Sequence, residues 1–106
     1  MTAVVVGALW VGAAAEPSGP RGGAAVFKAR CARCHGESGK TDTPGARALK
    51  VRPLANDARL AGMTSAEIVR AIEADAKHEA LGALTGVDDA ELRAAAAFVK
   101  ELAGRR

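Results

Sequence analysis

Residues 31–35 read CARCH and hold the two cysteines of a chain of 106 residues. Cys31 and Cys34 are three positions apart, and His35 directly follows the second cysteine. Because side chains three apart on a helical turn lie on the same side, both thiols and the imidazole can act on one partner. Three chemistries use such an arrangement: a dithiol–disulfide redox switch, a metal site, and covalent attachment of haem.

The first two chemistries fit the flanking sequence poorly. A thioredoxin-like C-x-x-C pair lies beside a βαβ unit, whereas both flanks here have helical patterns and no segment alternates like a strand. A zinc site would need Cys31, Cys34, His35 and His78 as ligands. The adjacent Cys34 and His35 would then have to bend back onto one ion, whereas structural zinc sites space their ligands in separate clusters.

Haem attachment uses every residue of the motif. Cys31 and Cys34 can each form a thioether with one vinyl group of the porphyrin, and His35 can place its Nε2 under the iron. C-x-x-C-H is the sequence pattern of covalent haem attachment. The motif therefore predicts one covalently bound haem c per chain, with His35 as the proximal iron ligand.

The first 15 residues, MTAVVVGALWVGAAA, form a short apolar run that ends in small residues. Such a run before a polar stretch predicts a secretory signal cut near Ala15, which leaves residues 16–106 as the domain of a periplasmic protein. The alternative is a membrane anchor. A spanning helix needs about 20 apolar residues, and this run is shorter, so we expect no membrane span after cleavage.

The remaining domain has few large apolar side chains. The chain has no tyrosine, its one tryptophan, Trp10, lies in the predicted signal, and Phe27 and Phe98 are the two phenylalanines. A domain this small is marginally stable without a staple or cofactor. A disulfide that closes so short a loop would constrain the unfolded chain little. The composition therefore also predicts a bound group in the centre of the fold.

The hydrophobic pattern predicts a single all-α domain with three main helices. Thr64 with Glu67, and Asp88 with Glu91, have the spacing of capping boxes. The expected helices are residues 22–34, residues 64 to about 75–77, and residues 88–103. Between the first two, Pro44 and Pro53 argue against long regular structure.

The charges of the chain say little about its binding partners. The chain has 15 basic and 12 acidic residues, with a net charge of +3, spread along the sequence without a basic block. It lacks the aromatic surface set that stacks on bases, so we expect no nucleic-acid partner. Mild basicity can steer an acidic partner, although an ordinary solvated surface explains it more simply.

The stretch GAAVFKARCARCHG resembles the first helix and haem motif of class I c-type cytochromes, which show G-x-x-x-[FY] before C-x-x-C-H-G. The segment VDDAELRAAAAFVKEL is similar to the last helix of that family, with Phe98 and Val99 at the Tyr-Val or Phe-Val position. The resemblance covers about residues 20–103. It implies a cytochrome c-like fold in which the first and last helices cross, with Gly23 against Phe98.

The resemblance also implies a sixth iron ligand, usually a methionine on a loop before the last helix. Here that loop contains no methionine, and Lys77-His78-Glu79 stands at the corresponding place. His78 lies beyond the second helix on a stretch that can fold back over the haem, and imidazole is a sound ligand for iron. We therefore expect His78 as the sixth ligand. The alternatives are Met63, which is better placed to fill the core, and an open site.

Other roles follow from the same resemblance. His35 should donate its Nδ1–H to a backbone carbonyl, with Pro53 the best candidate and Pro44 the alternative. The haem propionates need donors, for which Lys50, Arg52 and Arg59 are candidates. Apolar contacts to the ring are expected from Phe27, Leu49, Leu54, Leu60, Ile68, Ile72 and Leu81, although each can equally be a core residue.

The sequence thus predicts a monomeric electron carrier that works with redox protein partners and is not an enzyme. The principal rival is a haem protein that senses or binds a small ligand such as NO or CO after His78 dissociates. A peroxidase fragment is a weaker rival, because no distal acid–base constellation is present.

Overall fold

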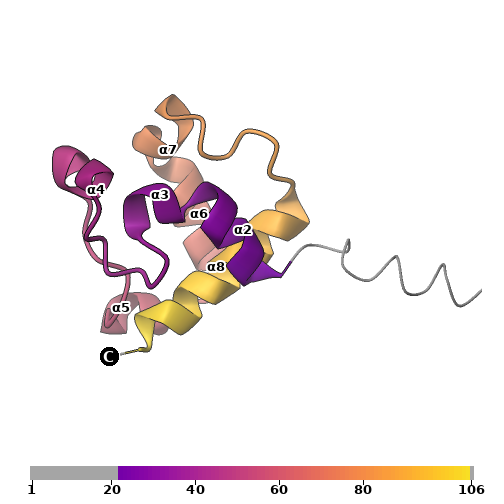
Figure 1. Cartoon of the computed structure of the whole chain (residues 1–106). Helices are drawn as coiled ribbons and strands as arrows, with labels where there is room; N and C mark the ends of the chain where they lie inside the picture. Colours follow the sequence, from indigo (N-terminus) through magenta and orange to yellow (C-terminus); the bar gives the residue numbers. More distant parts are fainter. Residues whose placement is uncertain (1–21, 106) are drawn as a thin grey trace, which may run out of the picture.

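The structure, a computed structural model, describes residues 22–105 as α-helices joined by loops, with no strand within this range (Figure 1). The all-α prediction is therefore confirmed. The helices are α2 (Gly23–Arg30), α3 (Ala32–His35), α4 (Pro44–Leu49), α5 (Ala58–Ala61), α6 (Ser65–Ala74), α7 (Ala76–Ala80) and α8 (Asp89–Ala103).

Both predicted capping boxes are present. The Thr64 hydroxyl accepts from Glu67 N (3.1 Å) while the Glu67 carboxylate accepts from Thr64 N (2.8 Å). Asp88 and Glu91 make the same exchange at 2.7 and 3.2 Å. Each box satisfies two backbone donors that a helix start leaves unpaired. The sequence therefore located the starts of α6 and α8 correctly.

The structure differs from the prediction in three places. The first helix is broken at Cys31 (φ −114°, ψ −34°), which ends α2 and begins α3. The segment expected to lack long regular structure contains two short helices that were not predicted, α4 and α5; Thr43 caps α4, whose first residue, Pro44, needs no N–H partner there. His78 was expected on a loop, but it lies on α7, which Asp75 caps by accepting from Lys77 N.

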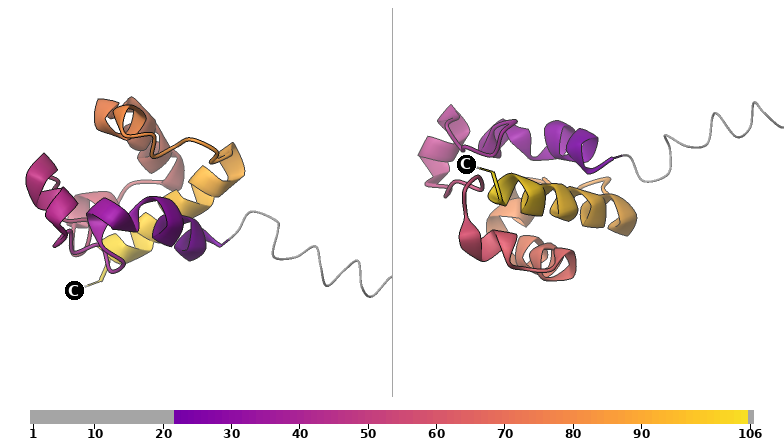
Figure 2. Two further views of the ribbon diagram at one scale, coloured as in Figure 1. Left: turned by 45° about the horizontal axis from the view of Figure 1, so that its top comes forward. Right: turned by 90° about the horizontal axis from the view of Figure 1, so that it is seen from below.

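Helices α2 and α8 pack directly against each other (Figure 2). A Cβ on Gly23 would collide with the Ala94 carbonyl and lie 3.0 Å from Phe98 Cβ. The rings of Phe27 and Phe98 lie beside this contact, with centroids 5.3 Å apart. Gly23 therefore meets Phe98, as predicted, because only a residue without a side chain lets the two backbones approach so closely.

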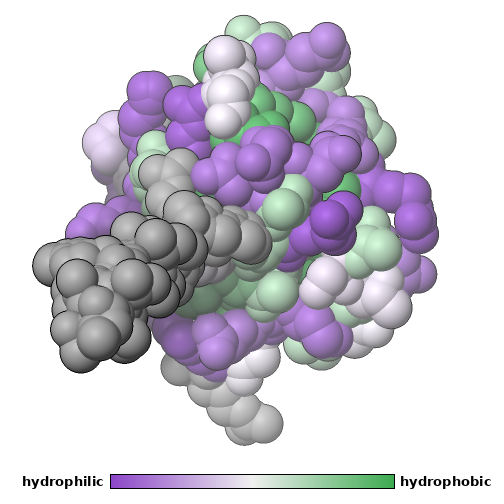
Figure 3. All heavy atoms as spheres, turned by 90° about the vertical axis from the view of Figure 1, so that its right-hand side faces the viewer, coloured by the Kyte–Doolittle hydropathy of each residue, from purple (hydrophilic) through white to green (hydrophobic). Residues whose placement is uncertain are grey.

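The hydrophobic core is small and rich in alanine. Its largest fully buried side chains are Phe27, Ile68, Leu102 and Val26, and the other buried apolar residues are Ala46, Leu92, Ala95, Ala96, Val99 and Ala103. On the face shown in Figure 3, apolar and hydrophilic side chains are interspersed. The limited core agrees with the prediction that a domain this small needs a further stabilising group.

Replacing Gly23 by alanine should destabilise the fold. The new methyl group has no space against the Ala94 carbonyl, so α2 and α8 must separate, which costs about 1–3 kcal/mol for overpacking. Gly62→Ala is the matched control, because its Cβ would meet Ala58 O at an ordinary 3.5 Å and its φ is −88°. Thermal unfolding should show a lowered Tm for Gly23→Ala alone. Equal Tm values for the two variants would contradict the close crossing.

No helix within residues 22–105 is long and apolar enough to cross a membrane. The predicted signal, residues 1–15, lies outside the described residues, and it stays a prediction.

Candidate functional site

The motif occupies the junction between α2 and α3. Cys31 is the hinge residue, and Cys34 and His35 lie in the single turn that follows. His35 N donates to Cys31 O at 3.0 Å, and Cys34 N donates to the same carbonyl at 3.2 Å. Both thiols are free and half-buried. The junction thus holds two thiols and one imidazole within five successive residues.

The residue after the motif has to be glycine. Gly36 has φ 77° and ψ 153°, a conformation that is essentially restricted to glycine. This turn redirects the chain, and Thr41 N then donates to His35 O at 2.9 Å. The backbone on both sides of His35 is therefore fixed.

Helix α4 fixes the other side of the motif. The Thr43 hydroxyl donates to Cys34 O at 2.7 Å and accepts from Ala46 N at 3.0 Å, so one side chain caps α4 and ties it to the motif. Gly45 faces the second thiol, since a Cβ there would lie 3.4 Å from Cys34 Sγ. Helix α4 therefore borders the second cysteine.

His78 approaches from a different part of the chain. Its Nδ1 lies 3.1 Å from Ile72 O, and because a carbonyl oxygen can only accept, Nδ1 carries the proton. In the neutral imidazole with this tautomer, Nε2 is the nitrogen whose lone pair can bind a metal. Beside it, Lys77 Nζ donates to Leu49 O at 3.1 Å, which links α7 to the end of α4.

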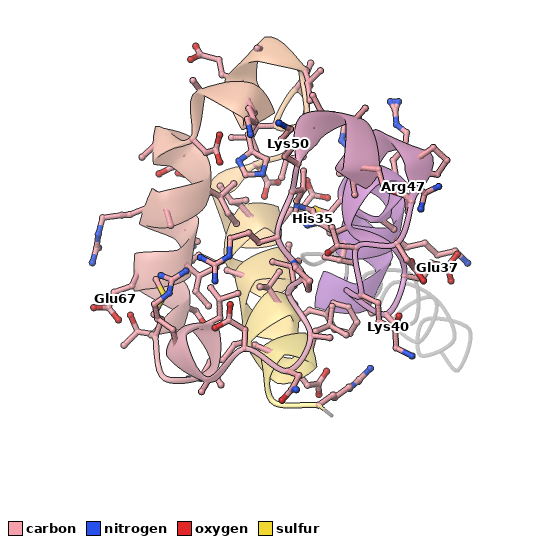
Figure 4. All side chains as sticks on the ribbon, turned by 90° about the vertical axis from the view of Figure 1, so that its left-hand side faces the viewer. His35, Glu37, Lys40, Arg47, Lys50 and Glu67 are labelled. Carbon is pink, nitrogen blue, oxygen red and sulfur yellow. The ribbon has the colours of Figure 1, made fainter. Side chains whose placement is uncertain are left out.

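The rings of His35 and His78, from two distant parts of the chain, lie close together. Their centroids are 6.3 Å apart and their planes are inclined by 32°. Imidazole nitrogens bind first-row metal ions at about 2.0 Å. The centroid of an imidazole ring lies roughly 1.2 Å behind the nitrogen that binds the ion. Two imidazoles that bind one ion from opposite sides therefore have ring centroids about 6.4 Å apart. Figure 4 shows His35 directed into the middle of the molecule, between the α3–α4 side and the α6–α7 side.

The protonation states suit metal binding better than thiol redox chemistry. Burial lowers the pKa of His35, and His78 lowers it further while Asp75 opposes this, so His35 is a neutral imidazole at pH 7. Burial raises the pKa of Cys31 to about 11, against a smaller lowering by Arg30. Since the thiolate is the nucleophile in disulfide exchange, this disfavours a redox switch. Within residues 22–105, no group of three or more His, Cys, Asp or Glu could hold a metal ion.

Comparison with known protein families decides between the remaining chemistries. Residues 21–103 match the cytochrome c family. The chain belongs to this family. The match covers every helix from α2 to α8, together with the motif. No curated protein and no solved structure matches the chain.

Membership of the cytochrome c family implies covalently bound haem c, and the observed residues fit that group. Cys31 and Cys34 supply the two thiols that thioether attachment requires, on one side of a helical turn. His35 follows them, and a second imidazole lies at the separation that one shared ion requires. Cys31 and Cys34 would hold the haem covalently, and His35 and His78 are candidate ligands of its iron.

The apolar residues expected around the haem range from fully buried to exposed. Phe27 is fully buried, and its ring centroid is 6.4 Å from that of His35. Leu54, Leu60, Met63 and Ile72 are partly buried against the core cluster, and Leu81 is 58% exposed. Met63, the alternative sixth ligand, thus packs as a core-filling side chain. Its backbone carbonyl also accepts from Lys100 Nζ at 2.8 Å.

The predicted partner of His35 is wrong. His35 Nδ1 is buried and has no hydrogen-bond partner, whereas Pro53, the expected acceptor, is exposed. Pro44 is also not the acceptor, because it is the first residue of α4, where the carbonyl points along the helix axis. A buried polar atom without a partner is uncommon in packed interiors. Such an atom is more typical of a functional site.

Three contacts that hold the site in place were not predicted from the sequence. Thr43 had a recognisable signal, since a Thr before a Pro is typical of a helix start. The contacts of Lys77 with Leu49 O and of His78 with Ile72 O have no such signal. Their acceptors are backbone carbonyls, which every residue carries, so only the fold selects them.

Proposed function

We propose that this protein is a periplasmic cytochrome c that carries single electrons between redox proteins, with one haem bound axially by His35 and His78. The observation that carries the axial assignment is the 6.3 Å separation of the two imidazole rings. The proposed location is supported by the predicted signal.

Each residue of the site has a distinct role in this proposal. Cys31 and Cys34 attach the haem covalently, so it cannot dissociate when the iron changes its charge. His35 binds the iron from the motif side. His78 binds from the opposite side, and its Nδ1–H donates to Ile72 O, which orients the ring and makes Nε2 a stronger ligand.

The arrangement supports electron transfer rather than catalysis. When bound, haem c supplies a one-electron exchange between ferric and ferrous iron. With imidazoles on both axial sides, no coordination position remains for a substrate. Hydrogen bonds hold the backbone of His35 on both sides and the ring of His78 against Ile72 O, so the positions of the two residues should change little between oxidation states. A low reorganisation cost favours rapid electron transfer.

A second candidate function is the binding of a small ligand such as NO or CO. It is favoured by the short helix, α7, that holds His78 in place. Helix α7 has only five residues, and Asp75 interrupts the helical backbone between α6 and α7. Short segments with few buried contacts open locally at low free energy. If α7 opened readily, His78 would leave and a diatomic ligand could take its place.

Adding CO to the reduced protein separates the two functions. For an electron carrier we expect an absorption spectrum that is unchanged by CO over minutes, because His78 stays in place. His78→Ala serves as the open-site control and should bind CO at once. If the native protein bound CO as rapidly as this variant, the carrier function would be rejected in favour of ligand binding.

A further inference from the structure

Thr41, in the loop that follows the motif, combines two features that are uncommon for a threonine. It is buried, with 9% of its surface exposed, and its φ of 59° lies in the left-handed region. A β-branched residue rarely adopts this conformation, because its side chain crowds the backbone there. Such strain persists only where surrounding contacts hold the residue in place, and it is concentrated at functional sites. The strain of Thr41 therefore indicates a role in the site.

The contacts of Thr41 join the motif to a distant segment of the chain. Its backbone N–H donates to His35 O at 2.9 Å. Its hydroxyl donates to Gly39 O at 3.2 Å and to Arg52 O at 3.3 Å. Because a hydroxyl carries one proton, the two carbonyls share it. Thr41 therefore holds the backbone of His35 beside the segment that contains Pro53.

Pro53 is fixed on both sides by the loop after the motif. The carbonyl of Arg52, the residue before it, accepts from the Thr41 hydroxyl. The N–H of Leu54, the residue after it, donates to Gly39 O at 2.8 Å. The peptide groups on either side of Pro53 therefore cannot turn unless one of these hydrogen bonds breaks.

We propose that Thr41 is a positioning residue that keeps the Nδ1–H of His35 without a carbonyl acceptor, because it holds Arg52 O; this rests on the proposed function, in which His35 binds the haem iron. His35 Nδ1 is buried and has no hydrogen-bond partner among the described residues, and Pro53, which was expected to supply the acceptor, is exposed. An imidazole whose second N–H has an acceptor is a stronger ligand and stabilises ferric iron. Thr41 therefore acts through His35 and raises the midpoint potential.

The test removes the hydroxyl of Thr41 and measures the redox equilibrium. Thr41→Val keeps the shape of the side chain but releases Arg52 O, which can then turn to the Nδ1–H of His35. In redox titrations of the holoprotein, this variant should raise the ratio of ferric to ferrous haem at a fixed applied potential by roughly 3- to 10-fold. A tenfold change corresponds to about 59 mV for a one-electron couple. Thr41→Ser keeps the hydroxyl and should restore the native ratio. An unchanged or lower ratio in Thr41→Val would overturn the proposal.

Thr41→Gly separates this role from a purely structural one. Glycine adopts a φ of 59° without strain, so this variant should fold even if Thr41→Val does not. It also lacks the hydroxyl and should show the same increase in ferric haem as Thr41→Val, whereas its Tm should be higher. If the redox ratio followed the Tm across the valine, serine and glycine variants, and not the presence of the hydroxyl, the role would be structural and the proposal would be wrong.

The Nδ1–H of His35 can also be observed directly. Ferrous haem with two axial protein ligands is low-spin and diamagnetic, so isotope-labelled histidine gives interpretable proton resonances. In Thr41→Val the resonance of this proton should move to lower field and exchange more slowly with water, because the proton gains an acceptor. The Nδ1–H of His78 donates to Ile72 O in both proteins, so its resonance is an internal control. A His35 resonance that stayed in place would contradict the proposal.

Thr43→Val is the matched control. The Thr43 hydroxyl donates to Cys34 O and accepts from Ala46 N, so its loss also loosens the motif but releases no carbonyl of residues 52–55. The redox ratio and the His35 resonance should change little in this variant. Equal changes in Thr41→Val and Thr43→Val would overturn the proposal, because they would show a general loosening of the motif. A native holoprotein without a reversible one-electron couple would instead count against the proposed function itself.

Discussion

Replacing His78 by alanine should open one axial position of the haem. The variant protein should change its absorption spectrum in both oxidation states, and its reduced form should bind CO rapidly. The physical reason is the placement of the two rings, whose 6.3 Å separation leaves room for one ion between them. Without the second imidazole, only His35 remains as a protein ligand.

Substitution of His78 by methionine should have a different effect. A thioether stabilises ferrous iron better than an imidazole does, so the midpoint potential should rise. An increase on the order of 100 mV is expected, within the span of about 0.8 V over which axial ligands set haem potentials. Redox titration of the purified protein measures this change.

A neighbouring residue provides the control for both variants. Glu79→Ala alters the next residue of α7, which is exposed, and should leave the spectrum and the potential nearly unchanged. If His78→Ala behaved like Glu79→Ala, His78 would not be the sixth ligand. Met63 or an open site would then have to be reconsidered.

Removing both attachment points should prevent folding as well as haem binding. In the double variant Cys31→Ala/Cys34→Ala we expect a colourless protein whose circular dichroism lacks most of the helical signal. The core offers few large side chains, with Phe27, Ile68 and Leu102 the largest that are fully buried. A domain of this size buries too little apolar surface on its own to offset the entropy of folding.

The control for this experiment is native protein produced without covalent haem maturation. It keeps both thiols, and it should be as disordered as the double variant if the haem, and not the cysteines themselves, supplies the stability. A well-folded apoprotein in either case would contradict the claim that the haem completes the core.

The sequence predicted the parts of the fold that local patterns determine. The capping boxes at Thr64 and Asp88 located the starts of α6 and α8, because they depend on residues three apart. The close contact of Gly23 with Phe98 was also foreseen, from the resemblance to a known family. In each case the signal lay in the types and spacing of side chains.

The features that were missed depend on how distant segments meet. The helix that carries His78 is too short to have a periodic pattern, and its stability comes from the Asp75 cap and the bond from Lys77 to Leu49 O. The isolation of His35 Nδ1 follows from the path of the loop after the motif, which leaves Pro53 exposed. Both features depend on which backbone carbonyl lies within reach of a side-chain donor. The sequence does not distinguish one carbonyl from another.

The ferric holoprotein reports directly on whether two imidazoles share one iron. Low-temperature electron paramagnetic resonance combined with magnetic circular dichroism distinguishes nitrogen from sulfur ligands and low-spin from high-spin iron. We expect a low-spin signal with two nitrogen ligands, from His35 and His78. A sulfur ligand, or a high-spin signal from an open position, would contradict the account.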